Sequence, residues 1–502
     1  MTLNTLDNYK TLRGKTVLLR IDLNSAFEGK KIVAGPRFDE HAKTVALLAK
    51  QGAKVVILAH QGRKGDDDFT SLKKHAEALC KLTNIKVGYS ADAEVVSEKT
   101  LALVRGLKPG QVLLLDNLRY LDEETMAHPP YEHSQGKLVS ALAPLADLYV
   151  NDAFSMCHRA HESIVGFPEV LASAAGPTLE HEIEAARKAR EQAAHPCVYV
   201  LGGNKPKEAI GLMRHALKKV IVDKILLAGV IGELCMIARG NEVPAPTRQA
   251  LKDAGHLEYL LELRDLIHKY HEFLETPFDF IVEGEDGEPQ VIMLTKIHDS
   301  EKPIGDIGPK TATKFSKIIM RAKTVYMKGP PGRYEQKVFE KGTKTILEAV
   351  AKTTAYTLVG GGHSSSALKK EHIALNRFSY VSLSGGALQE FLAGKDLPGI
   401  TALERSEKRF GATFGFHAAP KPKPVVEKHA HKTPAVEEIA AEEPEEKKAE
   451  KPAAKQPVKN KAKKTLVEKK AKPKAVKKAK KTKPQPAKSK PKKAAKPKKK
   501  RK

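Results

Sequence analysis

The stretch "LYVNDAFSMCHRAHES", residues 148–163, gathers polar side chains directly after a short apolar run. The run reads as the end of a buried strand, and the polar residues after it are Asn151, Asp152, His158, Arg159 and His161. A helix N-cap would account for Asp152. It would not account for an arginine and two histidines as well. So many charged and hydrogen-bonding groups at the mouth of a strand favour a binding site.

Polar side chains follow other apolar runs of the first half in the same way. In open α/β sheets, ligands bind beyond the carboxyl ends of the strands. The residues at these predicted ends, with one cation nearby, are Asp22, Asn24, Arg37, His60, Arg63, Arg119 and Arg159. One such arginine usually pairs with a surface acid, but several together favour a cleft for a small ligand with phosphate or carboxylate groups. Guanidinium groups bind those oxyanions through two parallel hydrogen bonds.

The second half offers glycine-rich turns in place of arginines: "VLGGNKPKEAI", "LVGGGHSSSAL" and "SLSGGALQEF". Glycine permits close backbone approach, and a following helix presents free N–H groups to phosphate. A single turn of this kind often merely ends a strand, but three of them, one with Lys205, favour a nucleotide phosphate site. No GxxxxGK[ST] motif occurs, which excludes a Walker-type NTPase. An anion site in one half and a nucleotide site in the other predict phosphoryl transfer across an interdomain cleft.

Short Val/Ile/Leu-rich runs alternate with helix-like stretches along the first 400 residues or so, for example "TVLLRIDL", "KVVILAH", "CVYVLGG" and "TVYMKGP". Such runs are typical of parallel strands covered on both faces. There are too many for one comfortable sheet. The predicted fold class is therefore α/β, with two doubly wound, Rossmann-like parallel-sheet domains joined by a hinge. An acidic surface hairpin is predicted around Glu285 and Asp286.

The chain has 502 residues and a formal net charge of +27, most of it near the C-terminus. Residues 418–502 contain 31 Lys or Arg and 9 Glu, a net charge of +22, which leaves +5 for residues 1–417. A segment of Lys, Ala, Pro and Glu without aromatic residues cannot bury enough apolar surface to order itself. This segment is predicted to be a disordered basic tail. Its part 451–502 is expected either to bind nucleic acid or another polyanion nonspecifically, or to be solvated without a dedicated partner.

Four widely spaced cysteines form no CxxC pair, which argues against a disulfide framework or a zinc ribbon. No apolar run approaches the ~18–20 residues of a membrane span, and the N-terminus lacks the apolar core of a secretion signal. The sequence predicts a soluble cytoplasmic protein.

Over nearly all of residues 1–415, the sequence resembles the phosphoglycerate kinase family. The matching motifs, in family order, are "RIDLNS" (20–25), "HQGR" (60–63), "LLDNLR" (114–119), "NDAFSMCHRAH" (151–161), "GGNK" (202–205), "DIGPKT" (306–311), "GPPGRYE" (329–335), "GGGH" (360–363) and "SGGA" (384–387). "RIDLNS" and "GGGH" look like the archaeal branch. The resemblance implies reversible phosphoryl transfer between 1,3-bisphosphoglycerate and ADP, giving 3-phosphoglycerate and ATP, with Mg²⁺ accompanying the nucleotide.

The resemblance also assigns roles to residues. The 3-phosphoglycerate site would comprise Asp22, Asn24, Arg37, His60, Gln61, Gly62, Arg63, Arg119 and Arg159. The nucleotide site would comprise Gly202, Gly203, Lys205, Glu335, Gly361, Gly362, His363 and Ser364. The residues at the transferring phosphoryl would be Arg37, Lys205, Gly385 and Gly386. Asn151, Asp152, His158 and His161 are expected to orient Arg159 and to brace the hinge. The two histidines are not expected to act as general bases, since a carboxylate nucleophile needs no deprotonation.

The domains implied are 1–177 for 3-phosphoglycerate, 178–196 as an interdomain helix or hinge, 197–395 for the nucleotide, 396–417 returning to the first domain, and 418–502 as the tail. Some positions depart from the family, among them Lys328 for asparagine, Leu383 for threonine and His363 for a magnesium-binding aspartate. No protein ligand for the metal is predicted. The alternative is a catalytically weakened kinase body that serves as a nucleic-acid- or ribosome-associated scaffold.

Overall fold

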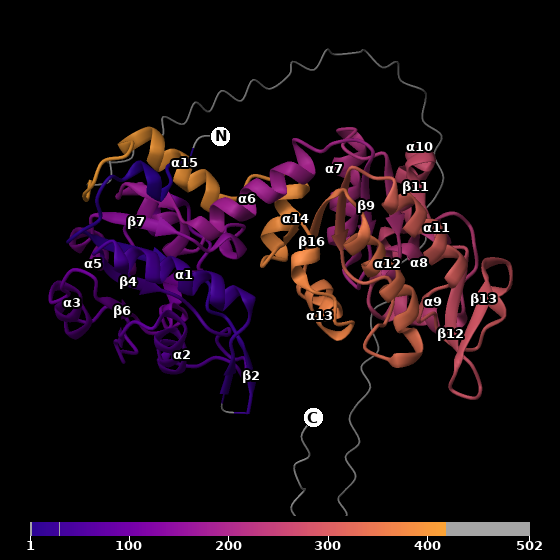
Figure 1. The fold of residues 1–502 in the computed structure, drawn as a ribbon, viewed down its shortest axis with the longest axis horizontal. Coiled ribbons are helices and arrows are strands. Elements are labelled where there is room, and N and C mark those ends of the chain that lie inside the picture. The colour runs from indigo at the N-terminus through magenta and orange to yellow at the C-terminus, as the bar shows by residue number, and fades with distance from the viewer. Residues whose placement is uncertain (1–2, 30, 418–502) are drawn as a thin grey trace, which may run out of the picture. The chain divides into compact units, whose positions relative to one another are not determined.

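The computed structural model describes residues 3–29 and 31–417, and in this part of the chain two six-stranded sheets are the main elements (Figure 1). The first has the order β5 (Val87–Tyr89), β6 (Val112–Leu114), β4 (Lys54–Leu58), β1 (Thr16–Arg20), β7 (Leu148–Asn151) and β8 (Ser173–Ala175). The second has the order β11 (Leu274–Glu275), β10 (Lys224–Leu227), β9 (Cys197–Leu201), β15 (Thr324–Lys328), β16 (Tyr356–Gly360) and β17 (Tyr380–Val381). Every pairing within these two sheets is parallel, which confirms the predicted fold class.

Helices cover both faces of the first sheet. Along β1, Val17 and Leu19 pack into a core with α1 (Pro36–Lys50) and α2 (Lys73–Thr83). Leu18, which points to the opposite face, belongs to a core with α3 (Glu98–Arg105) and α5 (Lys137–Leu142). A strand buried on both faces has no polar side, so its sequence is continuously apolar.

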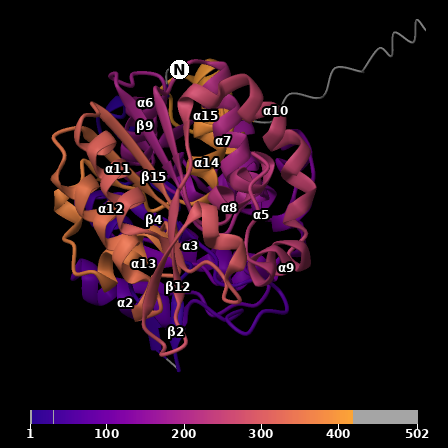
Figure 2. The ribbon, with the colours of Figure 1, turned by 90° about the vertical axis from the view of Figure 1, so that its right-hand side faces the viewer.

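The second sheet is covered in the same way, as Figure 2 shows. Alternate residues of β9 pack with α11 (Pro309–Met320) and α12 (Glu340–Lys352) on one face. The residues between them pack with α7 (Pro206–Lys218), α8 (Gly229–Ala238) and α10 (Leu260–Tyr270) on the other. Helices α9 (Ala245–Asp253), α13 (Gly362–Lys370) and α14 (Gly386–Leu392) complete this half.

The strand order places a crevice in each half. In the first sheet, β1 lies between β4 and β7, and in the second, β9 lies between β10 and β15. Connections that leave a central strand in opposite directions open a crevice at its carboxyl end. The polar residues predicted at the mouths of strands therefore face these two positions.

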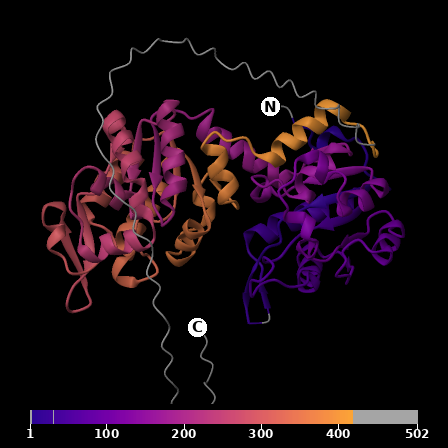
Figure 3. The same ribbon diagram turned by 180° about the vertical axis from the view of Figure 1, so that it is seen from behind.

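Two helices link the halves. Helix α6 (Pro177–Arg190) runs from β8 of the first sheet toward β9 of the second. Helix α15 (Pro398–Phe410) returns to the first half (Figure 3). There Arg409 pairs with Glu169 at 3.0 Å, and a β-bridge joins Leu171 to Phe416. The exact domain boundaries stay predictions, and the predicted tail, 418–502, lies outside the described residues.

Smaller elements surround the two sheets. β12 (Asp279–Glu283) and β13 (Pro289–Met293) form an antiparallel pair in which β13 is largely exposed, as the predicted acidic hairpin required. β14 (Asp306–Ile307) pairs with β12 on its other side, and β2 (Ala26–Glu28) pairs with β3 (Lys31–Val33). Among the described residues, no helix is long and apolar enough to cross a membrane.

Candidate active site

A cavity of about 690 Å³ brings the predicted anion site together with the second half of the chain. Its wall includes, of the predicted residues, Asp22, Asn24, Arg37, His60, Gly62, Arg63, Arg119, Arg159, Lys205, Gly385 and Gly386. Residues predicted for the substrate and residues predicted for the transferring phosphoryl thus share one space. Gln61 does not line it, because its side-chain amide is engaged by Ser25, Asp68 and His75.

The loops after β1 and β4 are tied to each other at the floor of this cavity. The Asn24 carboxamide oxygen accepts a hydrogen bond from the Gly62 N–H at 2.8 Å, and the Gln61 carboxamide oxygen accepts one from the Ser25 N–H at 2.8 Å. Each loop therefore fixes the other, and Gln61 acts within the scaffold of the site. Gly62 has φ +65° and its Cα is crowded by Asp68, so a larger residue would disrupt this arrangement.

The cavity carries more positive charge than its own acids neutralise. Burial, together with the neighbouring charges of Arg20 and Arg159, lowers the pKa of Arg119 to about 10. Burial and the charge of Arg63 likewise lower the pKa of Arg159. Guanidinium groups that depress each other's pKa are stabilised by a multivalent anion placed between them. The first half thus presents a cluster of cations that suits a multivalent anion.

Arg37 begins α1 and contacts both halves. One guanidinium nitrogen pairs with Asp22 at 3.0 Å, and another donates to the backbone oxygen of Leu383 at 2.8 Å. Burial opposes the ionisation of Asp22, but the Arg37 charge overcomes this and keeps the pKa of that carboxyl well below its usual range. Arg37 is therefore held at the junction of the two halves by charged and backbone acceptors.

The polar cluster after β7 divides into binding and bracing groups. Arg159 and His158 line the cavity, and the Arg159 Nε lies 3.2 Å from the His158 Nε2. Asp152 is fully buried and accepts hydrogen bonds from His41, Thr44 and Thr178. It thereby joins β7 to α1 and to the start of α6. The density of polar groups in this stretch serves the anion site and the packing around it.

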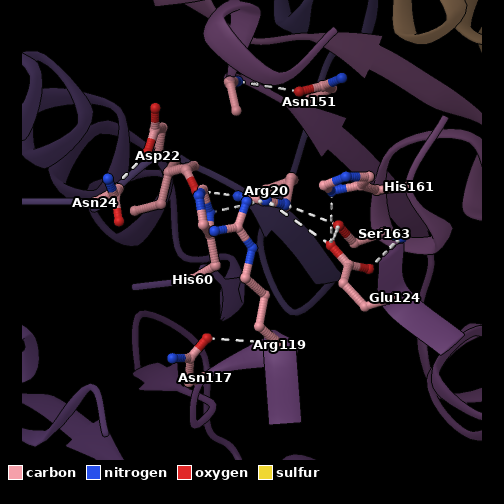
Figure 4. Close-up of polar contacts among 12 residues, drawn as sticks. Arg20, Asp22, Asn24, His60, Asn117, Arg119, Glu124, Asn151, His161 and Ser163 are labelled. Carbon is pink, nitrogen blue, oxygen red and sulfur yellow. Dashed lines mark hydrogen bonds and ion pairs between the residues drawn. The ribbon is translucent and has the colours of Figure 1, made fainter. Parts of the chain in front are cut away.

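A buried network behind the cavity was not predicted (Figure 4). Arg20, the last residue of β1, is fully buried; its Nε donates to the Ser163 hydroxyl at 2.9 Å, and its Nη2 lies 3.2 Å from the His60 Nδ1 and 4.0 Å from the Glu124 carboxylate. A guanidinium only donates, so His60 accepts at Nδ1 and carries its proton on Nε2. Burial, followed by the Arg20 charge, holds the pKa of His60 well below its usual range. His60 is therefore neutral at the cavity wall, with an N–H donor at Nε2.

The second half presents its glycine turns beside a separate cavity of about 450 Å³ lined by Gly203, Asn204, Glu335 and His363. Gly203 has φ +78°, and Gly202 packs so closely on Pro330 that a Cβ would lie 2.5 Å from its backbone oxygen. Gly361, at φ +95°, precedes α13. Glycine is favoured at positions 203 and 361 by the positive φ, and at position 202 because a side chain has no room.

Not every predicted nucleotide residue lines this cavity. The Ser364 hydroxyl donates to the Gly360 oxygen at 2.9 Å and accepts from the Gly329 N–H at 2.9 Å, so it fastens the turn after β15 to α13. Gly202 and Gly361 belong to the turns but do not line this cavity. Gly362 lines a third cavity between the halves. Lys205 does not line this cavity either. The roles assigned to all the nucleotide-site residues stay predictions.

Lys328, at the end of β15, belongs to an ion-pair cluster that sequence reasoning did not find. Its ammonium is nearly buried and lies 3.1 Å from the Glu208 carboxylate, whose other oxygen is 3.7 Å from the Lys205 ammonium. Burial lowers the pKa of Lys328, while Glu208 opposes this. Lys205, at the wall of the large cavity, thus shares an acid with a second lysine.

The turn before Gly385 is clamped from the first half and from α6. Glu182 of α6 is buried and accepts hydrogen bonds from the Ser382 hydroxyl at 2.6 Å and the Leu383 N–H at 2.7 Å. Arg37 holds the oxygen of Leu383. Both backbone groups of Leu383 are therefore fixed, and with them the approach of the Gly385–Gly386 turn to the cavity. The leucine side chain itself takes no part in these bonds.

Replacing Glu182 by glutamine is expected to change how stability varies with pH. Burial raises the pKa of Glu182 from 4.5 to about 7, although Ser382 and Leu383 lower it. A carboxyl with a raised folded-state pKa stabilises the fold fully below its unfolded pKa, and this contribution is lost as the pH rises through the folded value. Between pH 4.5 and 7, the free energy of unfolding of the unaltered protein should fall relative to Glu182→Gln by on the order of 3 kcal/mol.

Urea unfolding at several pH values measures this difference. Glu184→Gln alters an exposed acid two residues away on the same helix and should differ from the unaltered protein by no more than about 0.5 kcal/mol throughout. A difference for Glu182→Gln that stays constant across the pH range would rule out a carboxyl that is neutralised by burial.

The described residues contain no group of three or more His, Cys, Asp or Glu side chains that could hold a metal ion. His363, at the start of α13, offers a ring nitrogen, whereas Mg²⁺ prefers oxygen ligands and retains waters. The side chains at this turn therefore do not fit a protein-built magnesium site.

An anion-binding crevice in one α/β half, facing phosphate-type glycine turns in another, defines a phosphotransferase that acts on two substrates. The sequence model of the phosphoglycerate kinase family matches residues 6–395. The chain is 37% identical to the phosphoglycerate kinase of Methanopyrus kandleri, over 80% of this chain and 97% of that protein, and 37% identical to that of Saccharolobus solfataricus, over 81% and 98%. The crystal structure of phosphoglycerate kinase from Pyrococcus horikoshii superposes with a TM-score of 0.75 at 32% identity, covering 81% of this chain and all of that one.

The chain belongs to the phosphoglycerate kinase family, and archaeal members are among its relatives. The resemblance read from the motifs is thereby confirmed. Neither the relatives nor the solved structures support the alternative of a nucleic-acid-associated scaffold.

Proposed function

We propose that the protein catalyses reversible phosphoryl transfer between 1,3-bisphosphoglycerate and ADP, giving 3-phosphoglycerate and ATP. The observation that carries this proposal is the shared cavity in which Arg37 and Lys205 lie with the arginines of the first half and the Gly385–Gly386 turn of the second. Membership of the family supports it.

The residues of the first half bind the 3-phosphoglycerate. Arg63, Arg119 and Arg159 neutralise its oxyanions, and His60 donates from Nε2 because Arg20 occupies its Nδ1. Asp22 and Asn24 fix the loops that carry these groups. The attacking carboxylate is already ionised at neutral pH, so the reaction needs no general base.

The residues of the second half hold the nucleotide phosphates, and charge stabilisation provides the catalysis. Arg37 and Lys205 neutralise the charge that the transferring phosphoryl develops, and the backbone N–H groups at Gly385 and Gly386 donate to its oxygens. Gly203 and the start of α13 accommodate the nucleotide phosphates, and Glu335 binds the ribose. Each half alone holds one substrate, so hinge closure along 178–196 brings the two in line and excludes water.

Mg²⁺ would enter with the nucleotide and would supply neutralisation of phosphate charge. Because the His363 ring nitrogen does not suit this ion, phosphate oxygens and water, rather than side chains of this turn, would hold it. The domain limits given above and a cytoplasmic location belong to the same proposal.

A coupled assay that follows turnover of 3-phosphoglycerate with a magnesium nucleoside triphosphate tests the function directly. Robust turnover that depends on both substrates is the expected result. Absence of turnover with either ATP or GTP, in a protein that melts cooperatively, would contradict the proposal.

The segment 451–502, with 25 Lys or Arg and one Glu, is proposed to bind polyanions nonspecifically, independently of catalysis. Retention on immobilised DNA should weaken steeply as salt rises, since counterion release drives such binding. A protein that ends at Phe416 should lose this retention and keep its turnover. Equal retention of the two proteins would exclude the tail as the binding segment.

A further inference from the structure

The cavity of about 450 Å³ in the second half contains a carboxylate one turn beyond its phosphate end. Helix α8 begins against the glycine turn after β9, where the Val230 N–H donates to the Gly203 oxygen at 3.1 Å. Glu233, four residues after Gly229, lies on the same side of this helix and lines the same cavity. Glu233 therefore lies farther from the glycine turn and closer to α9, in the part of the cavity that a nucleobase would occupy.

The surroundings of Glu233 are mainly apolar. Val230, Leu251, Pro277, Phe280 and Ile304 line the cavity, and of these Leu251, Phe280 and Ile304 are buried. Such walls suit the flat faces of a purine ring, while a few polar groups fix which purine binds. Glu233 is partly exposed to the space of the cavity. Its carboxylate still needs an explanation, because a charge in mainly apolar surroundings is unfavourable without a partner.

The other acids of the cavity have identifiable roles. Asp306 accepts hydrogen bonds from the Ile307 N–H at 2.8 Å and the Thr343 N–H at 3.0 Å, so its carboxylate fixes the start of α12. Glu335 is exposed at the rim. Glu233 is the acid that remains: among the described residues, no donor forms a hydrogen bond with it and no cation forms an ion pair with it.

Burial raises the pKa of Glu233 to about 7, although the charge of Arg333 acts in the opposite direction. The Arg333 backbone N–H is bound to the Gly305 oxygen at 2.8 Å, and its side chain is exposed. The cavity therefore leaves the two Glu233 oxygens available to a ligand that supplies N–H groups.

We propose that Glu233 is a specificity-determining residue that selects guanine over adenine, so that GDP and GTP are the preferred nucleotides; this inference rests on the proposed function. An ionised carboxylate only accepts hydrogen bonds and has two oxygens side by side. Guanine presents two adjacent donors, N1–H and the 2-amino group, which match those oxygens. Adenine presents the N6 amino donor next to the N1 lone pair, and that lone pair would face a carboxylate oxygen.

Specificity constants for GTP and ATP, measured with 3-phosphoglycerate and Mg²⁺, test the inference. A charge-assisted hydrogen bond corresponds to about 10–10² in binding, so kcat/KM should favour GTP by at least about tenfold. Glu233→Gln keeps the shape but presents one donor and one acceptor, which suits adenine. It should lower kcat/KM for GTP by about tenfold or more and leave ATP equal or improved. Glu242→Gln, an exposed acid just beyond α8, should leave the ratio unchanged.

Inosine triphosphate separates the two bonds without altering the protein, since it retains N1–H and lacks the 2-amino group. Its kcat/KM should lie between those of GTP and ATP. Calorimetric dissociation constants for GDP and ADP give the same comparison without turnover and decide the matter even if the proposed reaction fails. Preference for ADP over GDP in the unaltered protein, or a GTP/ATP ratio that Glu233→Gln does not move, would overturn the inference while leaving the kinase function intact.

Discussion

Arg37→Ala is expected to lower kcat for phosphoryl transfer by about 10²–10³, the scale of losing one preorganised charge-stabilising donor. Arg37 is the cation that reaches both halves, through Asp22 in the first and the Leu383 oxygen in the second. Its loss removes positive charge from the transferring phosphoryl and frees the turn before Gly385. The coupled assay at saturating concentrations of both substrates measures this effect on kcat.

Three controls make the Arg37 result specific. Arg37→Lys restores the charge without the planar fork, so its kcat should fall between those of the alanine variant and the unaltered protein. Arg105→Ala removes an exposed arginine that pairs only with Glu98 among the described residues, and it should leave kcat unchanged. A melting temperature close to that of the unaltered protein excludes unfolding as the cause. Near-normal kcat in Arg37→Ala would refute the role assigned to this residue.

The parallel strands were predictable where burial on both faces leaves a continuous apolar run, as in β1, β4, β9 and β15. The short strands β8 and β11 were not. β8 has the sequence "SAA" and β11 contains two residues, so neither carries a pattern that local sequence could reveal. Such strands form because a neighbouring strand already presents unpaired backbone groups, a condition set by the tertiary fold.

The site divides along a similar line. Residues at strand mouths were predictable because topology brings the carboxyl ends of parallel strands together, and eleven of those predicted line one cavity. Buried partners were not, because their pairing spans long stretches of chain. Glu124 and Arg20 meet only in the folded protein, and Glu208 becomes informative only beside Lys328. The one local signal was the arginine within "VLLRID", a charged residue inside an otherwise apolar strand.

These buried partners show that the geometry of the site depends on more than the arginines that line the cavity. Arg20 sets the tautomer of His60, and Glu182 with Arg37 fixes Leu383. Neither Arg20 nor Glu182 lines the large cavity, so each acts by positioning other groups. The positions of the site's side chains thus depend on buried charged residues behind the cavity. Each of these needs its partner, because a buried charge without one is strongly unfavourable.

Glu124→Ala tests that dependence and is expected to lower the free energy of unfolding by about 3–5 kcal/mol, the typical effect of removing one partner of a buried pair. Glu124 is fully buried, accepts hydrogen bonds from the Ser163 N–H at 2.9 Å and hydroxyl at 2.7 Å, and compensates the fully buried Arg20 (Figure 4). Denaturant unfolding measures the loss. Glu132→Ala, an exposed acid nearby, should change stability by no more than about 0.5 kcal/mol.

A double variant, Arg20→Met with Glu124→Leu, separates the stability of this network from its function. Replacing a whole buried ion pair by apolar residues is often neutral or stabilising, so the double variant should recover much of the stability that Glu124→Ala loses. It should not recover turnover, because His60 would lack the donor that holds its Nδ1 as an acceptor, and either ring nitrogen could then carry the proton. A loss below about 1 kcal/mol in Glu124→Ala would show that the network does not sustain the fold. Full turnover in the double variant would show that it does not orient His60.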